Sequence, residues 1–235
     1  MTDKVAVITG GTGGLGTALV KRLRDWDLKF AITYLLPEEA AAFEEAIDLD
    51  EDRLILRRVD ATNAEAVNSF MKEVADTWGA IHMLCSLVGG WAGGRDVEET
   101  DDVRFERMID LNLRSAFYAV RATVPYLRQA GWGRILLVGS KAVEEAPPGQ
   151  AAFNIAKAGV VALAKTVAQE LEGSGVTANC LMPSVIDTPA TRAALPYADY
   201  VHWPTPEEIA DVAAFVLSEQ SRVMNGATVR VYGRA

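Results

Sequence analysis

Residues 10–16, which read GGTGGLG, are the part of the chain whose composition points most directly to chemistry. They follow the short apolar run at 5–9 and precede a segment with helical periodicity, TALVKRL. Glycines allow a tight turn with positive φ and let an anion approach the backbone closely. The free N–H groups and the positive dipole end of the following helix would face the same point, which suits a pyrophosphate. A glycine-rich turn between the first strand and the first helix therefore predicts a dinucleotide-binding site.

The chain offers few ligands for a metal ion. It has two histidines, His82 and His202, and no cluster of carboxylates with the spacing of metal ligands, so we expect no catalytic metal. Its two cysteines, Cys85 and Cys180, lie in apolar runs typical of strands. This placement predicts buried free thiols in a reducing cytosol.

An alternation of strand and helix patterns would position the turn. Short apolar runs rich in β-branched residues predict strands at 4–9, 29–34, 53–59, 81–87, 134–138, 176–182 and 228–232. Helical periodicity predicts helices near 14–25, 37–47, 63–77, 101–129, 150–172 and 206–219. Strands that are apolar along their whole length are buried on both faces. The pattern predicts one α/β domain over 1–235, a doubly wound Rossmann-type fold with a mostly parallel sheet of about seven strands flanked by helices.

The composition excludes several classes of protein. Of 235 residues, 50% are hydrophobic and 23% charged, as in a globular protein with a sizeable core. The net charge of −9 argues against a nucleic-acid partner. No run of about 18 apolar residues is present, and the first residues lack the features of a signal peptide. We therefore expect a cytoplasmic protein that neither spans a membrane nor binds nucleic acid.

Further motifs follow the turn in the order found in the short-chain dehydrogenase/reductase family, classical type, which the chain resembles over nearly its whole length. The turn has that family's spacing of Thr9, Gly10, Gly14 and Gly16. The later matching segments are DAT, MIDLNLRSAF, NIAKAG, NCLMPSVIDT and NGATVRVYG. The resemblance implies hydride transfer between the nicotinamide of NAD(H) or NADP(H) and a small-molecule carbonyl or alcohol substrate.

The resemblance also implies roles for individual residues. Ser140 would polarise the substrate oxygen, Lys157 would orient the nicotinamide ribose, and Asn112 would kink its helix around a water molecule of the proton relay. Asp60 matches the aspartate that holds the adenine amino group, and the segment from Asn179 through 183–188 matches the part that closes over the nicotinamide. The implied cofactor-binding residues are Gly10, Thr12, Gly14, Leu15, Gly16, Tyr34, Asp60, Ala61, Gly89, Lys157, Pro183, Ile186 and Thr188.

Phenylalanine stands where the family has its catalytic tyrosine. Phe153 lies four residues before Lys157, so the two side chains share one helix face. The spacing from Ser140 is the family's, so the alignment is not shifted. A phenyl ring has no hydroxyl and cannot transfer a proton, and a positioned acid typically lowers a barrier by roughly 3–5 kcal/mol. We therefore expect Phe153 to line the site as an apolar wall, with impaired or altered proton transfer.

Three explanations of Phe153 stay open at this point. The chain could be an active oxidoreductase whose acid is another residue, or a water relayed from Lys157 and Asn112. It could be a catalytically silent nucleotide-binding subunit or regulator. It could also carry a Tyr-to-Phe substitution made to trap a complex.

The segment 182–205 is expected to form a substrate lid. It contains several prolines and no strong periodicity, and an irregular loop of that length in a compact domain is typically functional. Its His202 could act as an acid at neutral pH. The alternative is that Tyr197, Tyr200, His202 and Trp203 pack the lid or a subunit contact. The acidic pair Glu144 and Glu145, near the expected substrate mouth, predicts a solvated loop or, alternatively, a preference for cationic substrates.

Selection between NAD(H) and NADP(H) stays open. The second strand ends in TYLL, with no carboxylate before Glu38 to hold a ribose 2′-hydroxyl and no cation beside it for a 2′-phosphate. Arg57 and Arg58 could reach the site, or could simply face solvent at the end of a strand.

The resemblance also concerns assembly, because members of the family often form tetramers through their long helices and last strand. The helices expected at 101–129 and 150–172 are rich in Ala, Val and Leu, which would allow this here. We therefore expect a homo-oligomer, either a tetramer or a dimer.

Overall fold

Seven strands pair in parallel to form one sheet, in the order β3-β2-β1-β4-β5-β6-β7. The computed structural model describes residues 4–234. The strands are β1 (Lys4–Thr9), β2 (Leu28–Tyr34), β3 (Leu54–Arg58), β4 (Met83–Ser86), β5 (Gly133–Val138), β6 (Val176–Pro183) and β7 (Thr228–Val231). The strand order reverses beside β1, and in such sheets ligands bind outside the carboxyl ends of the strands at this point. The predicted fold class is confirmed.

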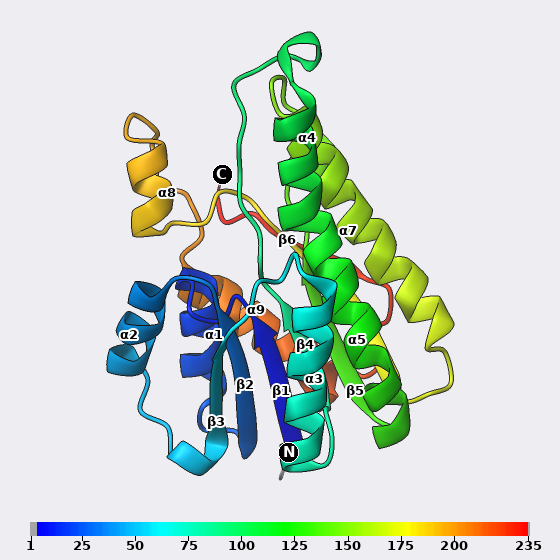
Figure 1. The fold of residues 1–235 in the computed structure, drawn as a ribbon. Helices are drawn as coiled ribbons and strands as arrows, with labels where there is room; N and C mark the ends of the chain where they lie inside the picture. The colour runs from blue at the N-terminus through cyan, green and yellow to red at the C-terminus, as the bar shows by residue number, and fades with distance from the viewer. Residues whose placement is uncertain (1–3, 235) are drawn as a thin grey trace.

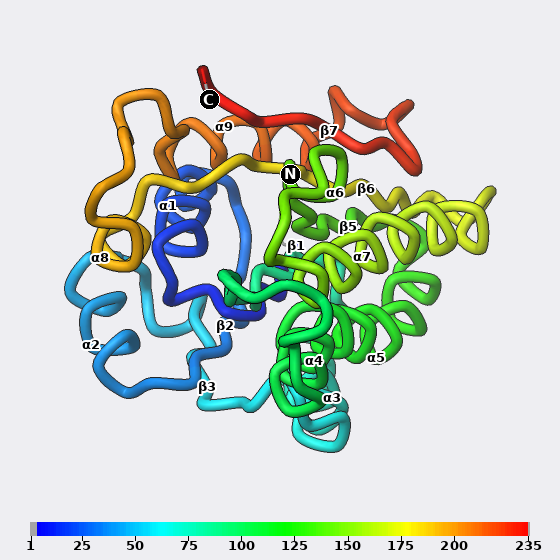
Figure 2. The backbone as a smooth tube through the Cα atoms, turned by 90° about the horizontal axis from the view of Figure 1, so that it is seen from above, coloured from blue at the N-terminus to red at the C-terminus, as the bar shows by residue number. Residues whose placement is uncertain are grey.

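Helices cover both faces of the sheet (Figures 1 and 2). Helices α1 (Gly14–Leu23), α2 (Pro37–Ala46) and α9 (Pro206–Leu217) contribute to one buried apolar cluster, and α3 (Ala64–Trp78), α5 (Ser115–Ala130) and α7 (Ala151–Glu170) to the other. Successive residues of β1 alternate between them: Val5 and Val7 join the second cluster, while Ala6 and Ile8 join the first. Burial on both faces explains why the strands are apolar throughout.

The single helix expected at 101–129 is interrupted. It consists of α4 (Asp102–Ile109), a π-helical turn at Asp110–Arg114, and α5. Asn112 lies in this turn, and its Nδ2 donates to the carbonyl of Met108 at 3.1 Å, an acceptor that a regular helix would use for its own backbone. The interruption therefore lies where the resemblance implied a kinked helix.

The segment 182–205, which is expected to form a lid and keeps that name below, contains a helix that its irregular pattern did not predict. Helix α8 (Pro189–Ala194) begins with Thr188 as the N-cap and proline at the first position. The same threonine–proline pair, Thr205–Pro206, begins α9, so a sequence signal for α8 was present. The amide of Asp187 donates to the carbonyl of Pro204 at 3.0 Å and so closes the base of the lid. Helices α4 and α8 stand above the carboxyl ends of the strands (Figure 1).

Helix α7 corrects the expectation that no segment is apolar enough to span a membrane. By length and composition alone α7 passes that test, and 44% of its apolar window is buried inside the protein. Its buried residues Val160, Ala164 and Val167 belong to the cluster on the α3–α5–α7 face of the sheet. A helix packed on a sheet needs an apolar face for this burial, and α7 has the composition of such a core helix.

Both cysteines are free and buried, as predicted. Burial raises the pKa of the Cys85 thiol to about 12 and that of Cys180 to about 11. Thiols that stay protonated at neutral pH are poor nucleophiles, so neither cysteine is a candidate for catalysis.

Candidate active site

Close contacts in the turn between β1 and α1 leave no space for a side chain at Gly11 and Gly16. Gly10 has φ +68°, which favours glycine. A Cβ on Gly16 would lie 2.4 Å from the carbonyl oxygen of Gly11, and a Cβ on Gly11 would lie 2.7 Å from Cγ2 of Ile32. The amide of Gly10 donates to Oγ1 of Thr33 at 3.1 Å, which fastens the turn to the end of β2. The glycines are therefore required by the shape of the turn.

Helix α1 presents open amide groups at this turn. It has no side-chain N-cap and no acidic residue in its first turn. Within residues 4–234, the amides of Gly14, Leu15 and Gly16 donate to no acceptor. Uncapped N–H groups at the positive end of a helix bind anions. The turn thus fits the diphosphate of a dinucleotide.

Three predicted residues from distant parts of the chain meet at one point. Gly89 follows β4, Asn112 lies in the π-helical turn, and Lys157 lies in α7. A Cβ on Gly89 would lie 2.9 Å from Oδ1 of Asn112 and 3.1 Å from Nζ of Lys157. Glycine at this position is what lets the amide and the ammonium approach the same backbone.

Asn112 fastens the backbone after β4 to the interrupted helix. Its Oδ1 accepts from the amide of Gly90 at 3.1 Å, and its Nδ2 donates to the carbonyl of Gly90 at 2.9 Å. With the bond to Met108, both hydrogens of the amide are used inside the protein, and the second lone pair of Oδ1 is left to accept from a water molecule.

Lys157 is a buried cation. Its Nζ donates to the carbonyl of Val138, the last residue of β5, at 2.9 Å. Burial lowers the pKa of Lys157 to about 8, because the charged form loses solvation and a carbonyl alone replaces little of it. The group is thus mostly protonated at neutral pH but releases its proton more readily than a surface lysine does.

Phe153 belongs to a small apolar cluster above the sheet. It is 9% exposed and packs with Met108, Ala142 and Ala152. Its ring centroid lies 6.0 Å from Nζ of Lys157, so the two face the same region, as their helical spacing predicts. Ser140 follows β5, and its Oγ accepts from the amide of Ala142 at 3.2 Å.

The residues expected at the adenosine end lie around the ends of β2 and β3. The carbonyl of Tyr34 accepts from the amide of Val59 at 2.9 Å, and Ala61 is buried. Oδ1 of Asp60 accepts from the amide and hydroxyl of Thr62 at 2.9 and 2.7 Å, which leaves Oδ2 for another donor. Thr12 is buried in the turn next to this region.

The lid reaches the glycine turn through Thr188. Its Cγ2 would lie 3.0 Å from a Cβ on Gly14, and its Oγ1 accepts from the amide of Thr191 to cap α8. Ile186 packs against the α1–α9 cluster, and the carbonyl of Pro183 accepts from the amide of Lys141 at 2.8 Å. The implied lid residues therefore reach the turn at Gly14, the first residue of α1.

Asn179 has a different role from the one that the resemblance implied. It is buried within β6, where its Oδ1 accepts from the amide of Ala227 at 2.9 Å and its Nδ2 donates to the carbonyl of Met224 at 3.0 Å. These bonds brace the segment that enters β7. Asn179 is therefore a structural residue and does not belong to the segment over the site.

The acidic pair is exposed, as expected of a solvated segment, but it lies in a helix and not in a loop. Glu144 and Glu145 end a short helix, α6 (Ala142–Glu145). Glu144 pairs with Arg230 at 2.8 Å and accepts from the hydroxyl of Tyr232 at 2.9 Å, while Glu145 pairs with Lys141 at 3.0 Å. Both carboxylates already pair with a cation of the protein, so the alternative of a preference for cationic substrates gains no support from them. The sequence could not show that β7 lies beside α6.

His202 lies with the lid and the C-terminal segment. It lines a cavity of about 430 Å³ with Asp187, Arg192, Tyr200 and Arg234, among others. Its carbonyl accepts from the amide of Arg234 at 3.1 Å, and no contact in residues 4–234 joins His202 to Ser140 or Lys157. Tyr200 stacks on the Arg192 guanidinium at 4.1 Å, while Tyr197 is fully exposed. This arrangement favours packing of the lid over the role of an acid.

Sequence reasoning missed two contributors to the site. The carbonyl of Val138 positions Lys157, and no side-chain pattern could reveal it. Glu39, in the first turn of α2, lies 3.5 Å from the hydroxyl of Thr12, measured from its Oε2. Its place in the helix after β2 was the available signal.

Comparison with known proteins agrees with this geometry. Residues 4–197 match the family model described as short chain dehydrogenase. The chain is 32% identical to the D-beta-hydroxybutyrate dehydrogenase of Rhizobium meliloti over 82% of its own length and 75% of that protein. It is 30% identical to the 2-dehydro-3-deoxy-L-rhamnonate dehydrogenase (NAD(+)) of a Sphingomonas species, over 98% and 94% of the two chains.

Solved structures give the same result. A short-chain dehydrogenase/reductase from Serratia marcescens superposes with a TM-score of 0.90 at 28% identity, covering 99% of this chain and 98% of that one. These relatives are oxidoreductases, which supports NAD(P)-dependent hydride transfer and does not favour a silent nucleotide-binding subunit. With its sheet order, its glycine turn and a family match over most of its length, this chain belongs to the short-chain dehydrogenase/reductase family.

Proposed function

We propose that this protein is an oxidoreductase that transfers hydride between a nicotinamide cofactor and a small carbonyl or alcohol substrate, with a weakened proton-transfer step. The observation that carries the proposal is the meeting of Gly89, Asn112 and Lys157 at the same end of the sheet as the open amides of α1. The cofactor, when bound, supplies or accepts the hydride.

Each part of the proposed reaction is assigned to a particular group of the protein. The amides of Gly14, Leu15 and Gly16 hold the diphosphate, and Lys157 orients the nicotinamide ribose. Ser140 donates its hydroxyl proton in a hydrogen bond to the substrate oxygen, which stabilises the negative charge that develops there. Phe153 closes the site on one side and excludes water without taking part in proton transfer.

The proton passes to the substrate oxygen from a water molecule held between Lys157 and Asn112, and the ammonium of Lys157 gives the water a proton in its place. The ammonium of Lys157 and Oδ1 of Asn112 face the same point beside Gly89, so one water can accept from the first and donate to the second. The lowered pKa of Lys157, about 8, brings its acidity closer to that needed at neutral pH. Transfer through water is slower than transfer from a fixed tyrosine, so we expect low turnover.

The substrate is proposed only as a class. The curated relatives are named for hydroxybutyrate, a deoxy sugar acid and a hydroxysteroid, which differ in size and charge. Specificity in this fold lies in loops, which vary more than the frame.

The test is oxidation or reduction of the nicotinamide, followed by its absorbance, with a panel of ketones and alcohols. We expect slow turnover that falls about 100-fold in Ser140→Ala, the magnitude of a lost charge-stabilising donor. Ser174→Ala is the matched control, because Ser174 bonds only near the end of α7, to Leu171 and Val176. Absence of saturable binding of both NADH and NADPH would refute the proposal. Turnover that appears only after Phe153→Tyr would instead favour the silent or trapped explanations.

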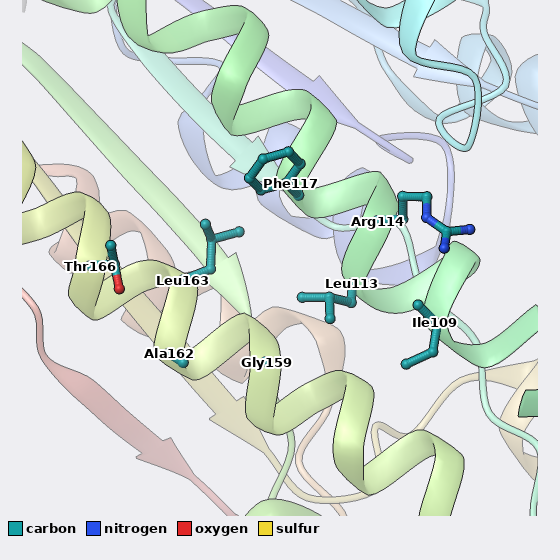
Figure 3. Close-up of a pocket in the computed structure, with 8 residues that line it drawn as sticks. All are labelled: Ile109, Leu113, Arg114, Phe117, Gly159, Ala162, Leu163 and Thr166. Carbon is teal, nitrogen blue, oxygen red and sulfur yellow. The ribbon is translucent and has the colours of Figure 1, made fainter. Parts of the chain in front are cut away.

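The proposal includes a homo-oligomer. A groove of about 380 Å³ lies between the helices α5 and α7 (Figure 3). Its lining is largely apolar: Ile109, Leu113, Arg114, Phe117, Gly159, Ala162, Leu163 and Thr166. Phe117 is 42% exposed at this surface. A second copy that brings the same face about a two-fold axis would cover it.

Sedimentation of the purified protein tests this assembly. We expect Phe117→Asp to reduce the oligomer to a smaller species. Val97→Asp should leave the assembly intact, because Val97 is exposed but lies outside the groove. A monomeric wild type would contradict the proposal. A cytoplasmic location is part of the same proposal and is supported by the two free thiols.

A further inference from the structure

The space between the glycine turn and α2 contains a carboxylate that faces a buried hydroxyl. Thr12 is 7% exposed, and its Oγ1 lies 3.5 Å from Oε2 of Glu39. Glu39 is held in the first turn of α2, where its amide donates to the carbonyl of Leu36 at 3.1 Å. The carboxylate therefore crosses from α2 to the turn that would hold the dinucleotide.

The cations near this carboxylate are turned to other partners. Residues 10–16 and 33–37 contain no lysine or arginine. Nε of Arg57 pairs with Glu73 of α3 at 2.9 Å. Nε of Arg58 donates to the carbonyl of Leu35, in the β2–α2 loop, at 3.1 Å. The side chain that contacts the turn itself is negative.

We infer that Glu39 makes this site selective for NAD(H) over NADP(H). In this fold the residue after the second strand reads the ribose 2′ position, where a carboxylate accepts from a hydroxyl. A 2′-phosphate would bring a second negative charge to within a few ångströms, and at the effective dielectric of a protein surface that repulsion costs at least about tenfold in affinity. The inference rests on the proposed function, since it concerns the cofactor of the same site.

The assignment differs from what the strand end alone suggests. The residues that end β2, TYLL, hold no carboxylate, so the acidic group comes from one turn into the next helix. Pro37 at the first position of α2 sets the direction of that turn. The contact with Thr12 distinguishes Glu39 from its neighbour Glu38, for which residues 4–234 provide no such contact.

Titration of the whole protein with NADH and NADPH, followed by tryptophan fluorescence and calorimetry, tests the inference without turnover. We expect wild type to bind NADH at least about tenfold more tightly than NADPH. Glu39→Gln should reduce this ratio by about tenfold, mainly by tighter NADPH binding, because glutamine removes the charge and keeps the shape. Added salt should weaken the discrimination in wild type and leave it unchanged in Glu39→Gln.

Glu38→Gln is the matched control, since it removes an adjacent exposed charge and should leave the ratio as in wild type. Thermal unfolding of each variant confirms that the fold is kept. The inference is overturned if Glu39→Gln keeps the wild-type ratio. It is also overturned if wild type prefers NADPH and Arg58→Ala removes that preference, because Arg58 would then read the 2′-phosphate. Failure to bind either nucleotide would refute the proposed function itself, which separates the two tests.

Discussion

The nucleotide end and the reaction end of the site are built from different parts of the chain. At the glycine turn the groups proposed to bind the cofactor are backbone amides. Gly11 and Gly16 must lack side chains there, because a Cβ would clash with neighbouring atoms. At the proposed reaction end the working groups would be the side chains of Ser140 and Lys157, and we propose that Phe153, which has no hydroxyl, weakens proton transfer there. The frame of both ends is intact. On this proposal, binding of the cofactor and transfer of the proton are separable properties.

The sharpest way to test this separation is to restore the hydroxyl. Phe153→Tyr should raise the turnover of a carbonyl substrate by about 10²–10⁴-fold, because a positioned acid replaces water, while NADH affinity stays the same. Steady-state rates and fluorescence titrations measure the two effects. Phe105→Tyr is the control, since it adds a hydroxyl beside the same apolar cluster without the helical pairing to Lys157. An equal rate in wild type and Phe153→Tyr would show that another acid already operates.

A change in the glycine turn should instead weaken cofactor binding. Gly16→Ala places a Cβ 2.4 Å from the carbonyl oxygen of Gly11, so the turn must open. We expect a loss of NADH affinity of at least about 100-fold and a destabilisation of several kcal/mol, as for overpacked sites. Gly13→Ala is the control, because its Cβ would meet nothing closer than the carbonyl of Gly10 at 3.5 Å. Calorimetry and urea unfolding measure both, and tight binding by Gly16→Ala would contradict this account of the turn.

Burial of the charged Lys157 side chain lowers the stability of the folded protein, and the dependence of stability on pH can measure this effect. Its pKa is about 8 in the folded protein and 10.5 without burial, so the folded state is penalised when the lysine is charged. The stability of wild type relative to Lys157→Met should therefore rise as the pH increases from 8 towards 10.5, by up to about 3 kcal/mol. Urea unfolding at several pH values measures this difference. Lys165→Met, at an exposed position on the same helix, is the matched control.

The smallest effect is expected away from both ends. Hydrogen bonds from Arg230 and Tyr232 lower the pKa of Glu144, so its charged form stabilises the fold. Glu144→Gln should lower the melting temperature slightly at neutral pH, and the difference from wild type should vanish as the pH falls well below 4.5, because the carboxylate is then protonated. Thermal unfolding checks this, with the exposed Glu172→Gln as control. If Glu144→Gln destabilised the protein more than Lys157→Met does, α6 would contribute more to the stability of the fold than this account assigns to it.

Much of the frame follows from local pattern. Each strand lies within two residues of its predicted ends, because strands buried on both faces are apolar along their whole length. The interruption between α4 and α5 and the helix α8 were harder to predict from local sequence pattern. The first depends on an amide that leaves its own helix to bind Gly90, and the second on a cap that occupies only two residues.

Some parts of the candidate site could likewise be predicted from the sequence, and others could not. The glycine turn could be predicted because its residues are consecutive and each is limited by its own backbone. The ion pair of Glu144 with Arg230 could not, because the partners come from α6 and β7 and no local pattern records their approach. The same holds for the meeting of Glu39 with Thr12.

By itself, the sequence determined the class of fold, the place of the dinucleotide turn and the absence of a hydroxyl at position 153. These are properties of single residues or of short periodic segments, whose physics is local. Only the tertiary structure decided that Lys157 is buried and donates to the carbonyl of Val138, and that Asn112 forms hydrogen bonds with the backbone after β4. It also decided that the carboxylate of Glu39, from α2, faces the glycine turn. Burial and charge pairing depend on which elements lie side by side, and that is set by the packing of the whole sheet.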